Sequence, residues 1–226
     1  RGELMAVFNT HVHGDHWLGN QALREARPDI PIYAHREMIN RVEAGEGEEW
    51  IANFIQSTDG AVAGTGVVAP NIGLLGGETL QFGGVQFLIH HTGQAHTNHD
   101  IMIEVKQGKS LFTGDIVTSN RVQSARPEDS SINGQIAAIE YALSLDIDIY
   151  VPGHGPAGGL EMVHEQLVFL QDLRASVEKH YADGLSDYEM KPKVMQDLSA
   201  YSRWQNYDEL GRVISHVYLQ VEEEAF

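Results

Sequence analysis

The stretch "NTHVHGDHWLGN", residues 9–20, places three histidines and an aspartate within six consecutive positions. In an extended segment, side chains two positions apart share a face, so His11 and His13 can grip one ion together. The glycine that follows allows the backbone to turn. Asp15 and His16 then stand at the start of a predicted helix and can point at a second ion. The stretch therefore predicts a metal centre.

Three later polar residues each follow a short apolar strand and stand in a glycine-containing turn. His96 lies in "TGQAHTNHD", Asp115 ends "SLFTGD", and His154 stands in "IYVPGHG". Strand ends are where separate chain segments converge, so these residues are candidates to complete the ligand set of two ions. Because the chain has no cysteine, every ligand must be His, Asp or Glu, and disulfides are excluded.

Composition narrows the class of protein. The chain has 226 residues, enough for one substantial α/β domain with a hydrophobic core. The 32 acidic residues against 15 basic ones argue against nucleic acid as a partner, because phosphate contacts need a basic face. No apolar run approaches the roughly 18 residues of a membrane span, so no membrane partner is expected. The compartment stays open between cytoplasm and periplasm.

Hydrophobic periodicity predicts alternating strands and helices, which indicates a layered α/β domain. We expect a Gly-rich loop over 57–77, a hairpin turning at Gly83 and Gly84, and a second hairpin turning near Gln107 and Gly108. The other predicted strands are 4–9, "IPIYAH" and "DIYVPGHG". The predicted helices are 16–26, 35–56 with a break near "AGEGE", 133–145, 160–182 and two more within 186–224.

At this point the chain resembles the metallo-β-lactamase fold superfamily. The match consists of His-x-His-x-Asp-His at 11–16 followed in order by His96, Asp115 and His154, and "GQAHTNHD", "LFTGD" and "VPGHGP" extend it. The nearest branch is the quinoprotein-relay or sulfur-oxidation-associated zinc hydrolases, with a glyoxalase II-like metal site.

The resemblance implies a role for each of these residues. His11, His13 and His96 would bind the first metal, Asp15, His16 and His154 the second, and Asp115 would bridge both. Imidazole and carboxylate ligands suit two zinc ions, with iron or manganese as alternatives. A hydroxide shared by the two ions would attack the substrate, and Asp15 would be the catalytic residue that orients it and carries a proton.

The implied fold is a four-layer αββα sandwich. Only ten residues precede His11, where the family has several strands, so we expect a chain that lacks the usual N-terminal strands, whether truncated, permuted or processed. Residues 1–160 would form the metal-binding domain, and 161–226 a helical extension packed on it. A sheet without those strands has an exposed edge, which a homo-oligomer or a second chain could complete.

The implied reaction is hydrolysis of a small, anionic ester, thioester, lactam, lactone or phosphoester. Asp115 stands where the commonest zinc β-lactamases carry cysteine, which favours the glyoxalase II, lactonase and relay-hydrolase groups. Two alternatives remain open. One is a mononuclear iron persulfide dioxygenase using His11, His96 and Asp115. The other is a non-catalytic member of the fold.

Several other residues are interpreted more plainly. His91 and His99 are either supports for the ligands or surface residues, and Thr97 and Asn98 either orient ligands or are structural. Arg121 and Arg126, in "VTSNRVQSARPEDS", are solvated loop charges or anion contacts. Trp50 and Phe54 wall a pocket or pack on a helix. We read His35, His164, His180 and His216 as non-functional, and Tyr201, Trp204 and Tyr207 as packing or oligomer contacts.

Overall fold

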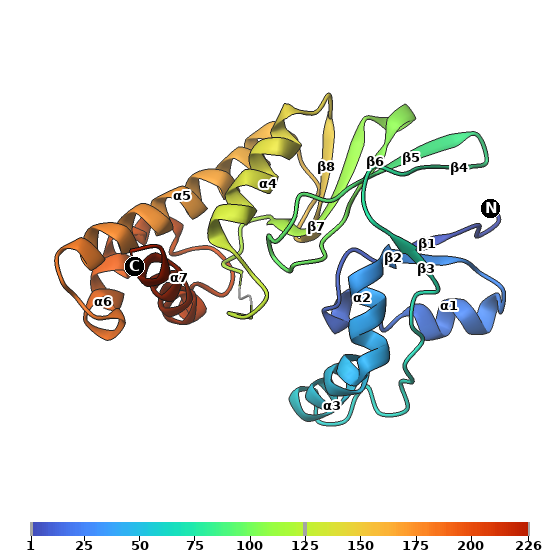
Figure 1. Cartoon of the computed structure of the whole chain (residues 1–226), viewed down its shortest axis with the longest axis horizontal. Helices are drawn as coiled ribbons and strands as arrows, with labels where there is room; N and C mark the ends of the chain where they lie inside the picture. Colours follow the sequence, from blue (N-terminus) through green and yellow to red (C-terminus); the bar gives the residue numbers. More distant parts are fainter. Residues whose placement is uncertain (1, 124–125, 226) are drawn as a thin grey trace. The chain divides into compact units, whose positions relative to one another are not determined.

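A computed structural model of the chain describes residues 2–123 and 126–225. These residues divide into two compact units. Unit 1 comprises Arg1–His91 and His99–Gly108, and unit 2 comprises Thr92–Asn98 and Lys109–Phe226. Strands and helices alternate along the chain, which confirms the predicted α/β class (Figure 1). The predicted division at residue 160 stays a prediction.

Unit 1 holds a parallel sheet in the order β1-β2-β3 and an antiparallel meander β4-β5-β6. The strands are β1 (Val7–Phe8), β2 (Ile32–His35), β3 (Ile72–Leu74), β4 (Thr79–Phe82), β5 (Val85–His90) and β6 (Met102–Val105). Its helices are α1 (Asn20–Ala26), α2 (Arg36–Arg41) and α3 (Gly47–Ser57). The β4–β5 hairpin turns at Gly83 and Gly84 as predicted, both with positive φ.

The sequence prediction failed within the Gly-rich stretch. We expected a loop over 57–77, but Ile72–Leu74 forms β3 and pairs in parallel with β2. Three residues are too few to show a period, so the strand is defined by its neighbour rather than by local pattern. The predicted helix break is confirmed. A π turn at Val42–Glu46, in which Gly45 has φ 112°, separates α2 from α3.

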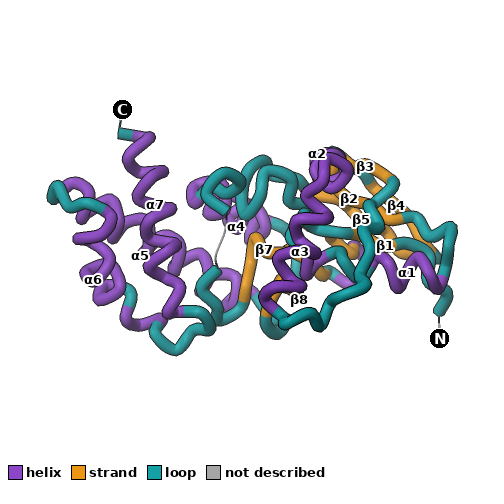
Figure 2. The backbone as a smooth tube through the Cα atoms, turned by 90° about the horizontal axis from the view of Figure 1, so that it is seen from below, coloured by secondary structure: helices purple, strands orange, loops and turns teal. Residues whose placement is uncertain are grey.

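Unit 2 is built on two parallel strands, β7 (Ser110–Thr118) and β8 (Ile149–His154). Its helices are α4 (Ile132–Ser144), α5 (Leu160–Ala182), α6 (Asp187–Asp197) and α7 (Leu210–Glu224). Helices α4 and α5 run side by side along this strand pair (Figure 1). Helices α5, α6 and α7 pack together beyond it (Figure 2).

The long helix α5 has the bounds that its sequence predicted. Val163, Leu167, Leu170, Leu173 and Val177 are all buried at helical spacing, so one face of the helix packs into the core. The tail aromatics pack here as well, because the ring of Phe169 lies 5.0 Å from that of Tyr201 and 4.9 Å from that of Trp204. None of the helices within residues 2–123 and 126–225 is both long and apolar enough to cross a membrane.

One buried amide of α5 yields a stability prediction. The side chain of Gln166 is 1% exposed, and neither of its polar atoms has a hydrogen-bond partner among the described residues. Burying an amide without a partner costs roughly 1–3 kcal/mol. The Gln166→Met variant is therefore expected to raise the free energy of unfolding by about 1–2 kcal/mol, measured by urea denaturation. The exposed Gln171→Met on the same helix is the control, and a loss of stability at 166 would contradict the prediction.

Candidate metal centre

Residues 9–20 form a loop that carries the histidine motif, and we call it the motif loop. It is anchored by Val12, the one apolar residue between its first two histidines. Alternation sends the side chain of Val12 into a core of Trp17, Ala34, Met38 and Val42. The backbone N–H of Val12 donates to Nε2 of His99 at 3.2 Å, and its carbonyl accepts from the indole nitrogen of Trp17 at 2.7 Å. Val12 is thus held by its side chain and by both backbone groups.

A pair of asparagines closes the loop at its two ends. Nδ2 of Asn20 donates to Oδ1 of Asn9 at 2.8 Å, and Nδ2 of Asn9 donates to Oδ1 of Asn20 at 3.1 Å. Both side chains are buried. Gly14, in the middle of the loop, packs closely against helix α3, since an added Cβ would lie 3.0–3.1 Å from Leu18, Phe54 and Trp50. Trp50 and Phe54 thus pack against Gly14, and the ring of Trp50 also lies 5.0 Å from that of His13, so the pocket-wall role stays a prediction.

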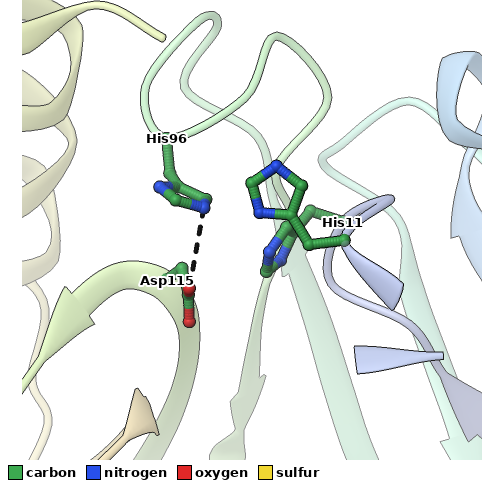
Figure 3. A group of neighbouring side chains, drawn as sticks. His11, His96 and Asp115 are labelled. Atoms are coloured by element: carbon green, nitrogen blue, oxygen red, sulfur yellow. Dashed lines mark ion pairs between the residues drawn. The ribbon is translucent and has the colours of Figure 1, made fainter. Parts of the chain in front are cut away.

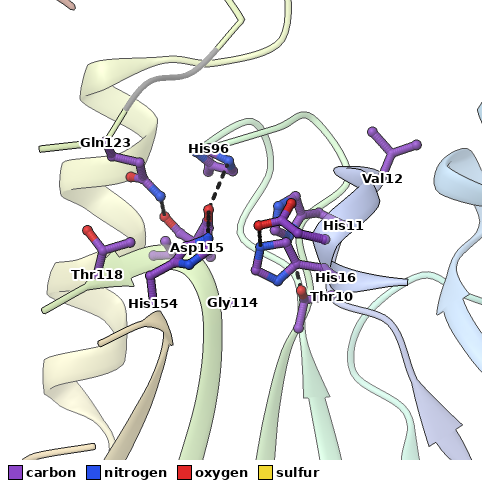
Figure 4. Close-up of polar contacts among 12 residues, drawn as sticks. Thr10, His11, Val12, His16, His96, Gly114, Asp115, Thr118, Gln123 and His154 are labelled. Carbon is purple, nitrogen blue, oxygen red and sulfur yellow. Dashed lines mark hydrogen bonds and ion pairs between the residues drawn. The ribbon is translucent and has the colours of Figure 1, made fainter. Parts of the chain in front are cut away.

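This anchored loop gathers three imidazoles. The ring centroid of His11 lies 4.7 Å from that of His13 and 4.2 Å from that of His16. Oγ1 of Thr10 lies 3.0 Å from Nδ1 of His11 (Figure 4). Oδ2 of Asp15 lies 3.4 Å from Nε2 of His16, and the Asp15 side chain is 44% exposed. We call His11, His13, Asp15 and His16 the motif cluster.

Unit 2 gathers the other three predicted ligands around one carboxylate oxygen. Oδ2 of Asp115 lies 3.6 Å from Nε2 of His96 (Figure 3). The same oxygen lies 3.5 Å from Nε2 of His154, which Figure 4 shows beside it. Asp115 and His96 are buried, and His154 is partly exposed. We call these three residues the carboxylate cluster. The four motif residues thus lie together in unit 1, and the other three predicted site residues lie together in unit 2.

A glycine makes room for the Asp115 side chain. A Cβ added at Gly153 would overlap Oδ1 of Asp115 and would lie 2.8 Å from the carbonyl carbon of Gly114. Strand β8 therefore needs glycine at this position, one residue before His154. The glycine before His154 in the sequence therefore reflects the close approach of β8 to the Asp115 side chain.

The residues outside the two clusters divide into supports and unrelated groups. His99 is fully buried and bonds to Val12, so it supports the motif loop and is not a surface residue. Nδ1 of His91 lies 2.8 Å from the carbonyl oxygen of Asp100, and its ring stacks on that of His35 at 4.4 Å. Burial, together with the neighbouring His91, lowers the pKa of His35. These two histidines belong to unit 1 but to neither cluster.

Sequence reasoning missed one buried ionic group on β5 and β6. Nε2 of His90 lies 2.9 Å from Oε2 of Glu104, and Nζ of Lys106 donates to Oε1 at 2.6 Å. Burial acts to raise the pKa of Glu104, but the hydrogen bonds from Lys106 and His90 outweigh it and lower that pKa. A glutamate within the otherwise apolar run 101–105 was the sequence signal that could have indicated this group.

Of the tail histidines that we read as non-functional, two are buried. His164 is exposed on α5. His180 lies 3.1 Å from Oδ2 of Asp197, and His216 lies 3.1 Å from the carbonyl oxygen of Pro127. Burial lowers the pKa of His216. Arg121 contacts the side-chain oxygen of Gln205 at 3.4 Å, so it is tied to the tail. Ser124 and Ala125, in the same loop, lie outside the described residues.

The donor chemistry of the two clusters fits divalent metal ions. Five imidazoles and two carboxylates with no thiolate match the ligand preferences of zinc, iron or manganese. Two imidazole nitrogens near one carboxylate oxygen suit an arrangement in which each nitrogen faces its own cation and the oxygen lies between the two. The cradle at Gly153 keeps that carboxylate in place.

Comparison with known proteins adds three findings. The family model described as "Metallo-beta-lactamase superfamily" matches residues 1–154. A curated hydroxyacylglutathione hydrolase from Gloeobacter violaceus is 50% identical over 40 residues, and one from Crocosphaera subtropica is 45% identical over 40 residues. Each of these matches spans 18% of this chain and only 16% of the relative's length.

Solved structures extend the likeness over most of the chain. A metallo-β-lactamase from Pontibacter korlensis aligns with a TM-score of 0.54 at 20% identity, covering 74% of this chain and 69% of that one. The B3 metallo-β-lactamase BLEG-1 aligns with a TM-score of 0.57 at 22% identity, covering 74% and 77%. At these identities the likeness concerns the fold, and it confirms the predicted fold class.

Proposed function

Because the chain belongs to the metallo-β-lactamase superfamily, we propose that it is a dinuclear metal-dependent hydrolase of a small, anionic substrate. The candidate bonds are those of an ester, thioester, lactam, lactone or phosphoester. The names of the curated relatives make a hydroxyacylglutathione the first substrate to test.

The motif cluster and the carboxylate cluster supply the ligands in this proposal. We assign His11, His13, His96 and Asp115 to one ion, and Asp15, His16 and His154 to the other, with Asp115 as the bridge. The observation that carries the assignment is the pair of imidazole nitrogens 3.5–3.6 Å from a single Asp115 oxygen. Two ions held by these residues would supply an activated water at neutral pH and a Lewis acid for the substrate oxygen.

The protein residues have separate tasks. The buried Val12 and the asparagine pair hold the motif histidines in a fixed arrangement, so little reorganisation is needed when ions bind. Asp15 is the most exposed member of the motif cluster, and it is the residue we expect to orient the attacking water and to pass a proton to the leaving group. The positive charge of the two bound ions would favour a substrate with negative charge.

Metal analysis of the purified chain tests this proposal. Elemental mass spectrometry is expected to find two zinc ions per chain, and the loaded protein is expected to hydrolyse a hydroxyacylglutathione or another member of the five classes. The His154→Ala variant should retain about one ion. His164→Ala, on the exposed face of α5, is the matched control and should retain two.

Two other results would overturn it. A single iron per chain would favour the persulfide dioxygenase, which uses His11, His96 and Asp115. Absence of bound metal after incubation with zinc would favour a non-catalytic member of the fold.

A further inference from the structure

Strand β7 loses its register with β8 at the position of Asp115. Gly114 pairs with Pro152 and Thr118 pairs with His154, so β7 advances four residues while β8 advances two. Residues 115–117 therefore form a bulged segment of β7, opposite the single residue Gly153 of β8. A bulge redirects side chains, and here it lays the Asp115 carboxylate over Gly153.

Two buried glutamines bind the carbonyl groups of this bulge. The Nε2 of Gln135, on α4, lies 3.1 Å from the carbonyl oxygen of Ile116 and 3.3 Å from that of Asp115. The Nε2 of Gln123 also donates to the carbonyl of Asp115 (Figure 4). Gln135 in turn donates to Oε1 of Gln123 at 2.6 Å. The side chains of Gln135 and Gln123 are only 6% and 9% exposed.

We propose that Gln135 and Gln123 are positioning residues that hold the bulge, and through it the Asp115 carboxylate, in the orientation needed to bridge two metal ions. This inference rests on the proposed function. A backbone carbonyl inside the protein must find a donor, and the two glutamines supply donors to the carbonyls of Asp115 and Ile116. The glutamine pair meets that need only while the bulge keeps its present shape, so it favours the shape that aims Asp115.

Helix α7 holds the start of α4, the helix that carries Gln135, through hydrogen bonds from Gln220. Gln220 accepts from the backbone N–H of Ile132 at 2.8 Å and donates to the carbonyl of Ser130 at 3.1 Å. Ser131 caps α4, since its Oγ accepts from the N–H of Gly134 at 3.1 Å. The first turn of α4, which ends at Gln135, is therefore fixed by the tail. The tail helices thus contribute to the candidate metal centre without supplying a ligand.

Cobalt(II) binding tests the positioning role without any substrate. The Gln135→Met variant conserves volume and removes the donor to all three acceptors. It is expected to weaken Co(II) binding by about 10- to 100-fold, the range seen when an outer hydrogen-bond partner of a metal ligand is lost. The visible absorption of bound Co(II) should also change, because the geometry at Asp115 changes. Gln135→Glu, which keeps the shape but cannot donate when ionised, should act in the same direction.

Gln166→Met is the matched control, because Gln166 is an equally buried glutamine of the same unit that bonds to nothing described. It should leave Co(II) affinity and spectrum unchanged. If the unaltered chain binds two Co(II) ions and Gln135→Met binds them with the same affinity and spectrum, the positioning role is wrong and the proposed function stands. If the unaltered chain binds no Co(II), the proposed function itself fails. If Gln135→Met does not fold, the Gln123→Leu variant is measured instead, and it should likewise weaken Co(II) binding and change the Co(II) spectrum.

Discussion

The Asp115→Ala variant is expected to lose the bridging position and to bind fewer than two metal ions per chain. Its metal affinity should fall by more than the roughly 10- to 100-fold that loss of an outer partner costs, because a direct ligand is removed. Hydrolysis should fall with it, by about 1,000-fold or more, since the activated water and the Lewis acid both depend on the ions. Elemental analysis and the hydrolysis assay measure the two effects.

The physical reason lies in the surroundings of that carboxylate. Asp115 is 6% exposed, and His96 and His154 both direct Nε2 at its Oδ2. Two neutral imidazoles cannot balance the charge of two divalent ions, whereas a shared carboxylate offsets part of it and reaches both. Without this carboxylate, less of the positive charge of the two ions is offset, and each ion has one ligand fewer.

A matched variant separates this chemistry from general damage. Asp148→Ala removes an exposed carboxylate just before β8 and should keep both ions and full activity. Urea denaturation of metal-free Asp115→Ala shows whether the fold survives. Two tightly bound ions in a folded Asp115→Ala protein would show that Asp115 is no bridge.

The second large effect is expected from a single methyl group at Gly153. Gly153→Ala should destabilise the chain by about 3 kcal/mol, the upper end of the usual cost of overpacking, and should weaken metal binding at the same time. The added Cβ would overlap Oδ1 of Asp115 and press on the backbone of Gly114 at 2.8–2.9 Å. Either the carboxylate leaves its place or the strands separate. Urea denaturation and Co(II) titration report the two outcomes.

The glycine at 159 provides the comparison for this substitution. A Cβ there would meet only Oε2 of Glu161, at 3.1 Å, and φ is −96°, so Gly159→Ala should cost no more than the roughly 1 kcal/mol of an alanine at a helix N-cap. Wild-type stability and Co(II) affinity in Gly153→Ala would show that the strands tolerate the methyl group and that the cradle is not required.

Much of the local structure could be predicted because its causes are local. The helix at 160–182 follows from apolar residues at helical spacing, and the β4–β5 turn follows from two glycines that adopt positive φ. The short β3 could not be predicted, because three residues carry no period and only pairing with β2 makes them a strand. The same holds for the bulge in β7, which is defined by register against β8.

The sequence by itself determined the types and the order of the proposed ligands, because imidazole and carboxylate donors are chemical properties of single residues and their spacing is written along the chain. It also determined which side of the motif loop faces the core, since alternation at His11, Val12 and His13 is local. The tertiary structure decided which residues hold those ligands in place. His99 reaches Val12 across 87 positions and Gln135 reaches Asp115 across 20. Hydrogen bonds of that separation depend on how the whole chain packs, and so no local pattern predicts them.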